Sequence, residues 1–432
     1  MQIDRRRFLG SAALGAGSLT LACGPEATRA PNNPEPSAGA LPEAIRGLTP
    51  MTAGVVPITD AERKARIAKA QRLMQEQKID AIFMEGATSC FYYTGMRWGG
   101  SERTFGLVIP AKGEIAWVCP GFEEDRAREL LNPAFGKEVR VWQEEESPYQ
   151  LIAGIVRDRG VAHHRIGIEE RVRFFIADGI RKAATGTEIV DATPVTAGCR
   201  MFKSTAEIAL MQRANDVTIT AYQAGLKTMR EGMPQGELSA NIMAGFQALG
   251  FEGYASVQFG KWTALPHGSS TPQKLKEGDV VMIDDGVTCE GYQADITRTV
   301  VFGKPTQRQT EVWNTELAAQ TAAFKAIKIG RPCEEVDAAA RKVVVEAGFG
   351  PGYRVPGLPH RTGHGMGLDG HEWTNFVKGN RTPIQPGMCF SDEPMVAIPG
   401  EFGIRLEDDV YIGEDGPHFF TKQSVAIDQP FG

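Results

Sequence analysis

Apolar and polar residues first follow a regular period after residue 60. Apolar side chains recur at helical spacing at positions 67, 70, 73 and 74, and the short apolar run Ala81–Met84 that comes next is typical of a buried strand. Helix-like, strand-like and again helix-like stretches then occupy 148–155, 166–168 and 174–184. This alternation predicts a small α/β domain over residues 61–198.

A second unit begins near Lys203. Ser204 is followed three residues later by Glu207, which is a capping-box pattern at the start of a long helix. Further helical stretches are predicted at 235–249 and 310–348, and strand-like runs at 279–284, 295–302, 388–397 and 409–412. Helices that alternate irregularly with hairpin-like strands predict an α+β domain over residues 199–432.

The first 60 residues lack this periodicity. Arg5, Arg6 and Arg7 precede a weakly apolar run, too short to span a bilayer, that ends at Cys23. The Arg-Arg-x-Phe-Leu order resembles a twin-arginine export signal, and Cys23 resembles a lipoprotein cleavage site. We therefore expect residues 1–23 to direct export, to the periplasm or to a lipid anchor on the membrane through Cys23. The Pro-, Ala- and Gly-rich residues 24–60 are expected to form a flexible linker.

Composition narrows the function classes. A length of 432 residues favours two domains, and a formal net charge of -6 without a long basic run argues against nucleic acid as a partner. Of the seven cysteines, the six after Cys23 show no CxxC spacing. They are therefore expected to be buried thiols rather than a zinc site or a disulfide framework.

Two aspartates are the first candidate functional residues. Asp284 ends an apolar run just before a glycine turn, and Asp295 follows after ten further residues. If 279–287 and 291–301 pair as a hairpin, both carboxylates can face one cavity. A single aspartate at such a place is more often a turn former. Several carboxylates in an apolar setting indicate a cation, because burying an unpaired carboxylate is costly.

Histidines and glutamates add to this pattern. His360, His364 and His371, three of the seven histidines, fall within twelve positions of a glycine-rich stretch. Glycine lets the backbone approach a ligand, and neutral imidazole is a common metal ligand. Glu393 and Glu407 then end or interrupt apolar runs. Such an oxygen-rich set with imidazole suits manganese, iron, cobalt or zinc.

These stretches resemble a known family. IDDGVTCEGYQADITRT, HRTGHGMGLDGHE, SDEP and IRLED are similar to motifs of the M24 metallopeptidase superfamily, in the branch of Xaa-Pro aminopeptidases and Xaa-Pro dipeptidases (prolidases). The resemblance covers about residues 200–425 and implies a pita-bread catalytic domain. Residues 61–198 more weakly resemble the creatinase-type N-terminal domain of that branch. A homodimer is a further implication.

The resemblance also implies a ligand set and a nucleophile. Two divalent metal ions, expected to be manganese with cobalt, zinc or iron as alternatives, would be held by Asp284, Asp295, His364, Glu393 and Glu407. A hydroxide bridging the two ions would attack the scissile carbonyl, with Glu393 as the general base.

Four further residues match positions around the substrate. His267 and His371 match histidines that contact the scissile amide and the tetrahedral intermediate, and they are the other predicted catalytic residues. His360 matches a histidine near the proline side of the substrate. Arg405 matches an arginine that either supports the site or pairs with a substrate carboxylate. Asp285 and Glu372 are not assigned to the metal site.

The expected function is hydrolysis of the N-terminal Xaa-Pro bond of peptides with proline at the second position, that is, an Xaa-Pro aminopeptidase. The main alternative is an Xaa-Pro dipeptidase. A hydrolase of a non-peptide carbon–nitrogen bond and a non-catalytic binding protein on the same fold are less favoured, because such relatives do not need the metal ligands or have lost them. Trp262 or Trp373 could narrow the substrate cleft or simply pack at the surface.

Overall fold

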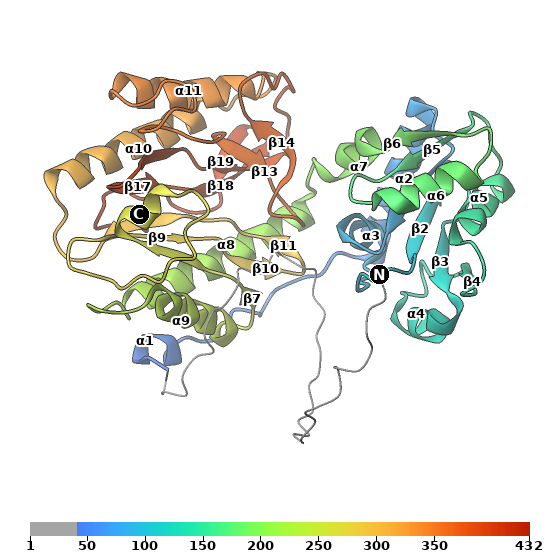
Figure 1. The fold of residues 1–432 in the computed structure, drawn as a ribbon, viewed down its shortest axis with the longest axis horizontal. Coiled ribbons are helices and arrows are strands. Elements are labelled where there is room, and N and C mark those ends of the chain that lie inside the picture. The colour runs from blue at the N-terminus through green and yellow to red at the C-terminus, as the bar shows by residue number, and fades with distance from the viewer. Residues whose placement is uncertain (1–40) are drawn as a thin grey trace, which may run out of the picture.

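The structure is a computed structural model that describes residues 41–432. The chain forms an N-terminal and a C-terminal domain, which lie side by side (Figure 1). The predicted export signal over residues 1–23 lies outside the described residues. Within 41–432, no helix combines the length and the apolar character needed to cross a bilayer.

The N-terminal domain is built on a mixed six-stranded sheet with strand order β4-β3-β2-β1-β5-β6. Its strands are β1 (Ala81–Glu85), β2 (Gly106–Pro110), β3 (Ala116–Pro120), β4 (Val139–Trp142), β5 (Arg165–Ile168) and β6 (Glu188–Asp191). Its helices are α2 (Asp60–Gln77), α3 (Thr88–Thr94), α4 (Glu124–Leu130), α5 (Pro148–Asp158), α6 (Phe174–Ala183) and α7 (Thr193–Arg200). The apolar run that predicted β1 is buried because β1 lies inside the sheet, between β2 and β5. The predicted α/β class is confirmed.

Residues 41–60 depart from the flexible linker expected for them. They contain the short helix α1 (Glu43–Arg46), whose Ile45 is fully buried against the C-terminal domain. The Met51 amide donates a hydrogen bond of 2.9 Å to the Leu249 carbonyl, and Ile58 is also buried. These few apolar side chains find a surface on a distant part of the chain, which local composition does not reveal. The rest of the expected linker, residues 24–40, lies outside the described residues.

The C-terminal domain places strands between two pairs of helices (Figure 1). The helices are α8 (Thr205–Leu226), α9 (Gln235–Ala248), α10 (Gln307–Ala326) and α11 (Glu334–Glu346). Two three-stranded sheets contain β7 (Glu252–Gly253), β8 (Ser256–Phe259), β9 (Val280–Asp284), β10 (Val287–Cys289), β11 (Tyr292–Gln293) and β12 (Arg298–Val301). A five-stranded sheet and a two-stranded one contain β13 (Gly363–Gly365), β14 (Glu372–Phe376), β15 (Cys389–Asp392), β16 (Met395–Ile398), β17 (Phe402–Arg405), β18 (Asp408–Gly413) and β19 (Gly416–Phe419).

Local sequence signals explain where several of these elements begin and end. Ser204 and Glu207 form the predicted capping box at the start of α8, each side chain accepting from the other's amide. The helical stretch expected over 310–348 is two helices. Gly330, with φ +82°, and Pro332 end the helical path between α10 and α11. Pro394 similarly divides the run expected over 388–397 into β15 and β16.

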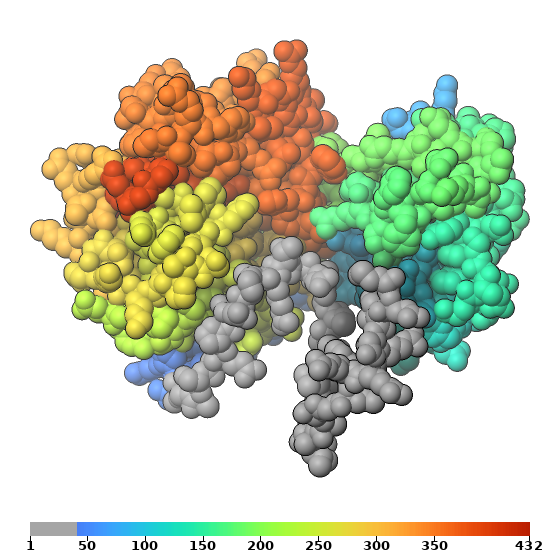
Figure 2. All heavy atoms as spheres, viewed as in Figure 1, coloured from blue at the N-terminus to red at the C-terminus, as the bar shows by residue number. Residues whose placement is uncertain are grey.

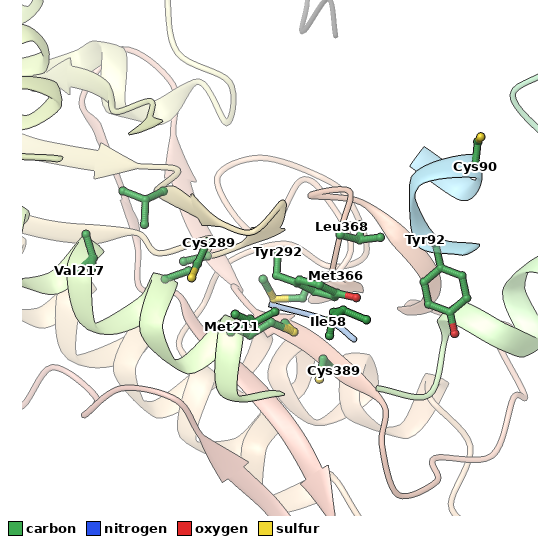
Figure 3. Close-up of a cluster of buried hydrophobic side chains, with 14 of the residues drawn as sticks. Ile58, Cys90, Tyr92, Met211, Val217, Cys289, Tyr292, Met366, Leu368 and Cys389 are labelled. Atoms are coloured by element: carbon green, nitrogen blue, oxygen red, sulfur yellow. The ribbon is translucent and has the colours of Figure 1, made fainter. Parts of the chain in front are cut away.

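One buried apolar cluster crosses the boundary between the domains. Figure 3 shows Met211 of α8, Tyr292 of β11 and Met366 close together beside Ile58, and Tyr92 of α3 belongs to the same cluster. On the face shown in Figure 2, the two domains form separate masses that touch along one side. The six cysteines within the described residues are buried, as predicted, and they form no disulfide with one another.

Candidate metal centre

A long hairpin brings the two aspartates together. β9 pairs antiparallel with β12, and Ile283 lies opposite Arg298. Between these strands Asp285 adopts φ +78°, so the chain leaves the sheet and forms the inner β10–β11 hairpin in a different sheet. The predicted hairpin is therefore present in two parts. Oxygen atoms of Asp284 and Asp295 lie within 4.8 Å of each other and of a Glu407 oxygen.

The other candidate ligands come from the neighbouring sheets. His364 lies on β13, Glu393 directly follows β15, and Glu407 lies between β17 and β18. Nitrogen or oxygen atoms of these three residues also lie within 4.8 Å of one another. In a third group, ligand atoms of Asp295, His364 and His371 lie within 4.8 Å of one another. The structure thus gathers all five predicted metal ligands and adds His371, whereas Asp285 and Glu372 are in none of the groups.

The charges of this cluster fit cations. Burial, reinforced by the neighbouring carboxylates, raises the pKa of Asp295 and of Glu407 well above the usual range. Burial also raises the pKa of Glu393, to about 7. For Asp284, burial opposes ionisation, but the Arg405 guanidinium and hydrogen bonds from Thr297 and the backbone together lower the pKa. Four carboxylates beside one guanidinium leave an excess of negative charge that two divalent ions would neutralise.

The His364 ring has the orientation and the neutral state that a metal ligand needs. Its Nδ1 donates to the Gly365 carbonyl at 3.1 Å, which leaves the lone pair of Nε2 free. Nε2 lies 3.3 Å from Glu393 Oε1 and 3.6 Å from Asp295 Oδ2. Burial, followed by the charge of His371, lowers the pKa of His364 well below its usual value, so the ring is neutral. A hydrogen bond from the ring nitrogen that does not bind the metal usually orients a metal-binding histidine.

Arg405 lies behind the cluster. This buried guanidinium donates from Nε to Thr297 Oγ1 at 2.9 Å, from Nη1 to the Pro266 carbonyl at 3.0 Å, and from Nη2 to Asp284 Oδ2. Each of its nitrogens therefore has a partner within the protein. Of the two roles that the resemblance left open for Arg405, this arrangement favours support of the site.

The remaining histidines lie around the cluster. The His371 ring is 4.1 Å from that of His364, and its Nδ1 is 3.2 Å from Arg361 Nη2. His360 Nδ1 is 2.7 Å from the Arg361 carbonyl, while its buried Nε2 has no hydrogen-bond partner among the described residues. Burial, then the charge of Arg405, lowers the pKa of His360 to about 4. His267 is exposed, in the loop after the short 3-10 helix at 260–264, and its charge contributes to the lowered pKa of both His360 and His371.

Three residues of the site had no assigned role in the sequence. Thr297 contacts Asp284 Oδ1 at 2.5 Å and Glu407 Oε2 at 2.6 Å. Ser391 accepts from the His364 amide at 3.0 Å and donates to Glu393 at 3.3 Å. Arg361 contacts His371. All three lie within or next to the quoted motifs, but their type alone does not distinguish them from structural residues.

A cleft of about 290 Å³ lies beside the cluster, at the boundary of the two domains. Its walls include Arg171 of the N-terminal domain and Arg361, His371 and Trp373 of the C-terminal domain. Trp373 is 42% exposed. Trp262 is not in the cleft wall, and its ring lies under Lys261 instead.

Comparison with known proteins agrees with this arrangement. Residues 209–414 match metallopeptidase family M24, and residues 66–202 match the creatinase/prolidase N-terminal domain. An uncharacterized peptidase of Schizosaccharomyces pombe is 35% identical over 402 residues, which are 89% of this chain and 86% of the relative.

Two crystal structures are similar over both domains. Dipeptidase PepE from Mycobacterium ulcerans has a TM-score of 0.79 and 30% identity, with 85% of this chain and 97% of that chain covered. Prolidase from Thermococcus sibiricus has a TM-score of 0.75 and 28% identity, with 83% and 97% covered. The similarity extends over both domains and nearly the whole length of these peptidases, and the chain therefore belongs to metallopeptidase family M24, with its pita-bread catalytic domain.

Proposed function

We propose that the protein is an Xaa-Pro dipeptidase that uses two divalent metal ions. The observation that carries the proposal is the buried cluster of four carboxylates and one neutral imidazole from Asp284, Asp295, His364, Glu393 and Glu407. Manganese is the proposed metal, because the donors are mainly oxygen. The similar structures named dipeptidase and prolidase favour a dipeptidase over the Xaa-Pro aminopeptidase that we expected first.

The metal ions, when bound, would supply an activated water and polarise the scissile carbonyl. Glu393 is the proposed general base. Its Oε1 accepts from Ser391 and faces His364, so the carboxylate has a fixed position at the cluster. It would accept the proton of the attacking water and pass that proton to the leaving proline nitrogen.

Neighbouring groups fix which nitrogen of each histidine carries the proton. Arg361 can only donate, so His371 Nδ1 accepts, and the proton of the neutral His371 ring lies on Nε2. His371 can then donate to the oxygen that becomes negative during the reaction. His360 has the opposite arrangement, because its Nδ1 donates to a carbonyl. Its Nε2 therefore carries a free lone pair and can only accept a hydrogen bond, and His267 would contribute from the exposed side of the site.

The test compares Gly-Pro with Gly-Pro-Ala. Purified protein should hydrolyse Gly-Pro, lose this activity with a chelator and regain it with added Mn²⁺, while Gly-Pro-Ala should be a much poorer substrate. Comparable rates with both peptides would make the protein an aminopeptidase. No metal-dependent cleavage of either peptide would contradict the peptidase proposal for these substrates.

A further inference from the structure

Arg361 is a half-buried arginine at the metal centre that forms no ion pair within the described residues. Its side chain contacts His371 Nδ1, and no carboxylate within the described part of the chain forms an ion pair with it. The other arginines nearby are paired. Arg171 lies 3.1 Å from Asp369, Arg200 lies 2.6 Å from the same residue, and Arg405 is bonded to Asp284. Arg361 therefore keeps most of its N–H donors available for an anion from outside the protein.

We propose that Arg361 binds the free carboxylate of the dipeptide substrate and thereby makes the enzyme select dipeptides. This inference rests on the proposed function. A guanidinium has five N–H donors in a planar fork that matches both oxygens of a carboxylate. One donor is used on His371, and no other hydrogen bond of this side chain is formed within the described residues. Enough donors remain for a two-point contact with a carboxylate.

The distance to His371 fits a carboxylate at the second residue of the substrate. In an Xaa-Pro dipeptide the carboxylate carbon is two bonds from the scissile nitrogen. His371 is the residue proposed to contact the reacting amide, and Arg361 Nη2 lies 3.2 Å from its ring. A third residue would move the carboxylate about 3.5 Å further along an extended chain. Arg361 would then face an uncharged amide instead.

The cleft offers room for the leaving residue. Its volume of about 290 Å³ lies between Arg361, His371 and Trp373. The half-exposed indole of Trp373 provides an apolar wall against which a proline ring can pack. The same cleft therefore presents a cation for the carboxylate and an apolar surface for the ring.

The experiment removes each partner in turn. Gly-Pro and its amide, Gly-Pro-NH₂, are assayed with wild type and with Arg361→Ala in the metal-loaded full chain. Any effect on His371 should be the same for both substrates, whereas loss of the charge-assisted contact should lower kcat/KM for Gly-Pro by about 10- to 100-fold more than for the amide, mainly through KM. Arg361→Lys should recover part of the loss, because it keeps the charge but not the fork.

A purely structural role of Arg361 gives a different result. Displacement of His371 would slow both substrates equally, and this outcome would overturn the inference. Arg171→Ala is the matched control. Arg171 lines the same cleft but is paired with Asp369, so its removal should leave the ratio of the two substrates unchanged.

Two further outcomes keep the inference separate from the proposed function. If wild type fails to cleave Gly-Pro with any metal, the proposed function fails. If wild type cleaves Gly-Pro and its amide equally well, only the role of Arg361 is contradicted. This last comparison needs no variant, so it can contradict the role of Arg361 even where Arg361→Ala does not fold.

Discussion

Arg405 and Thr297 are joined by a hydrogen bond of 2.9 Å from Nε to Oγ1, and the same arginine donates to Asp284. Thr297 in turn contacts Asp284 and Glu407. The arginine and the threonine thus form a support behind two of the proposed metal ligands. Because this guanidinium has partners at all of its nitrogens, its proposed task is to hold carboxylates of the protein, not one of the substrate.

Replacing Arg405 should therefore weaken metal binding. We expect Arg405→Lys to reduce metal affinity by about 10- to 100-fold, since residues that orient ligands have effects of this size. Activity on Gly-Pro should fall at limiting Mn²⁺ and recover with excess metal. Metal titration followed by calorimetry checks the affinity, with Arg308→Lys, an exposed arginine, as the control. A selective loss of Gly-Pro over Gly-Pro-NH₂ would instead make Arg405 the carboxylate receptor.

Asp284 and Asp285 are adjacent but should differ sharply in importance. Asp284→Asn should lose metal and Gly-Pro hydrolysis together, because a carboxylate of the cluster is removed. Asp285→Asn should keep most of the activity, since Asp285 is in no ligand group and asparagine tolerates its φ of +78°. Metal content per chain, measured by atomic emission, distinguishes the two variants. A metal-free Asp285→Asn protein would contradict the assignment.

Several residues of this cluster could be selected from local sequence, because Asp284, Glu393 and Glu407 end or interrupt apolar runs, whereas the full set of proposed ligands came from the resemblance to the family. The hairpin of Asp284 and Asp295 follows from two such runs joined by a glycine turn. Which of its two predicted roles Arg405 has could not be chosen from the sequence, since its partners Pro266 and Thr297 lie more than 100 residues away in the chain. That Arg361 forms no ion pair is visible only when all neighbouring acids have been placed. The packing of residues 41–60 could not be predicted either, because it depends on the surface of α8 and α9, which lie far away in the chain.

His360 should make stability depend on pH. Its pKa is lowered to about 4 in the folded protein, against about 6.5 in an unfolded chain. Between these values the unfolded state binds more protons, so the free energy of unfolding rises with pH across this window. From pH 7 to pH 4.5, wild type should lose about 2 kcal/mol more than His360→Gln.

Denaturant unfolding at the two pH values measures this difference. Both proteins are treated with a chelator first, so that release of metal in acid does not contribute. Equal losses in wild type and variant would show that His360 is not neutral by burial.

Arg200 should be important for stability. This buried arginine lies 2.6 Å from both Asp369 and Glu372. Burial opposes ionisation of Glu372, but the charge of Arg200, followed by that of Lys203 and by hydrogen bonds, lowers its pKa to about 2. Arg200→Ala should cost about 3 kcal/mol of unfolding free energy, because buried acids lose their partner. Arg308→Ala, which breaks an exposed pair with Glu401, should cost less than about 1 kcal/mol. Similar costs for both variants would mean that Lys203 and Arg171 compensate fully.

The proposed export signal can be tested by substitutions within residues 1–23. Replacing both Arg5 and Arg6 by lysine should leave the protein inside the cytoplasm of a host with a twin-arginine pathway. Cys23→Ser should release exported protein from the membrane fraction. Cell fractionation and immunoblotting follow both variants. Unchanged export of the double-lysine variant would contradict the twin-arginine assignment.

The segment around Ile45 makes the C-terminal domain discontinuous along the chain. Residues 41–58 pack against α8 and α9, while the whole N-terminal domain intervenes before α8 begins. A fragment cut at residue 199 would therefore expose the apolar surface that Ile45 covers. During synthesis, residues 41–58 can pack only after the N-terminal domain has emerged, because α8 and α9, which form their packing surface, follow that domain in the chain.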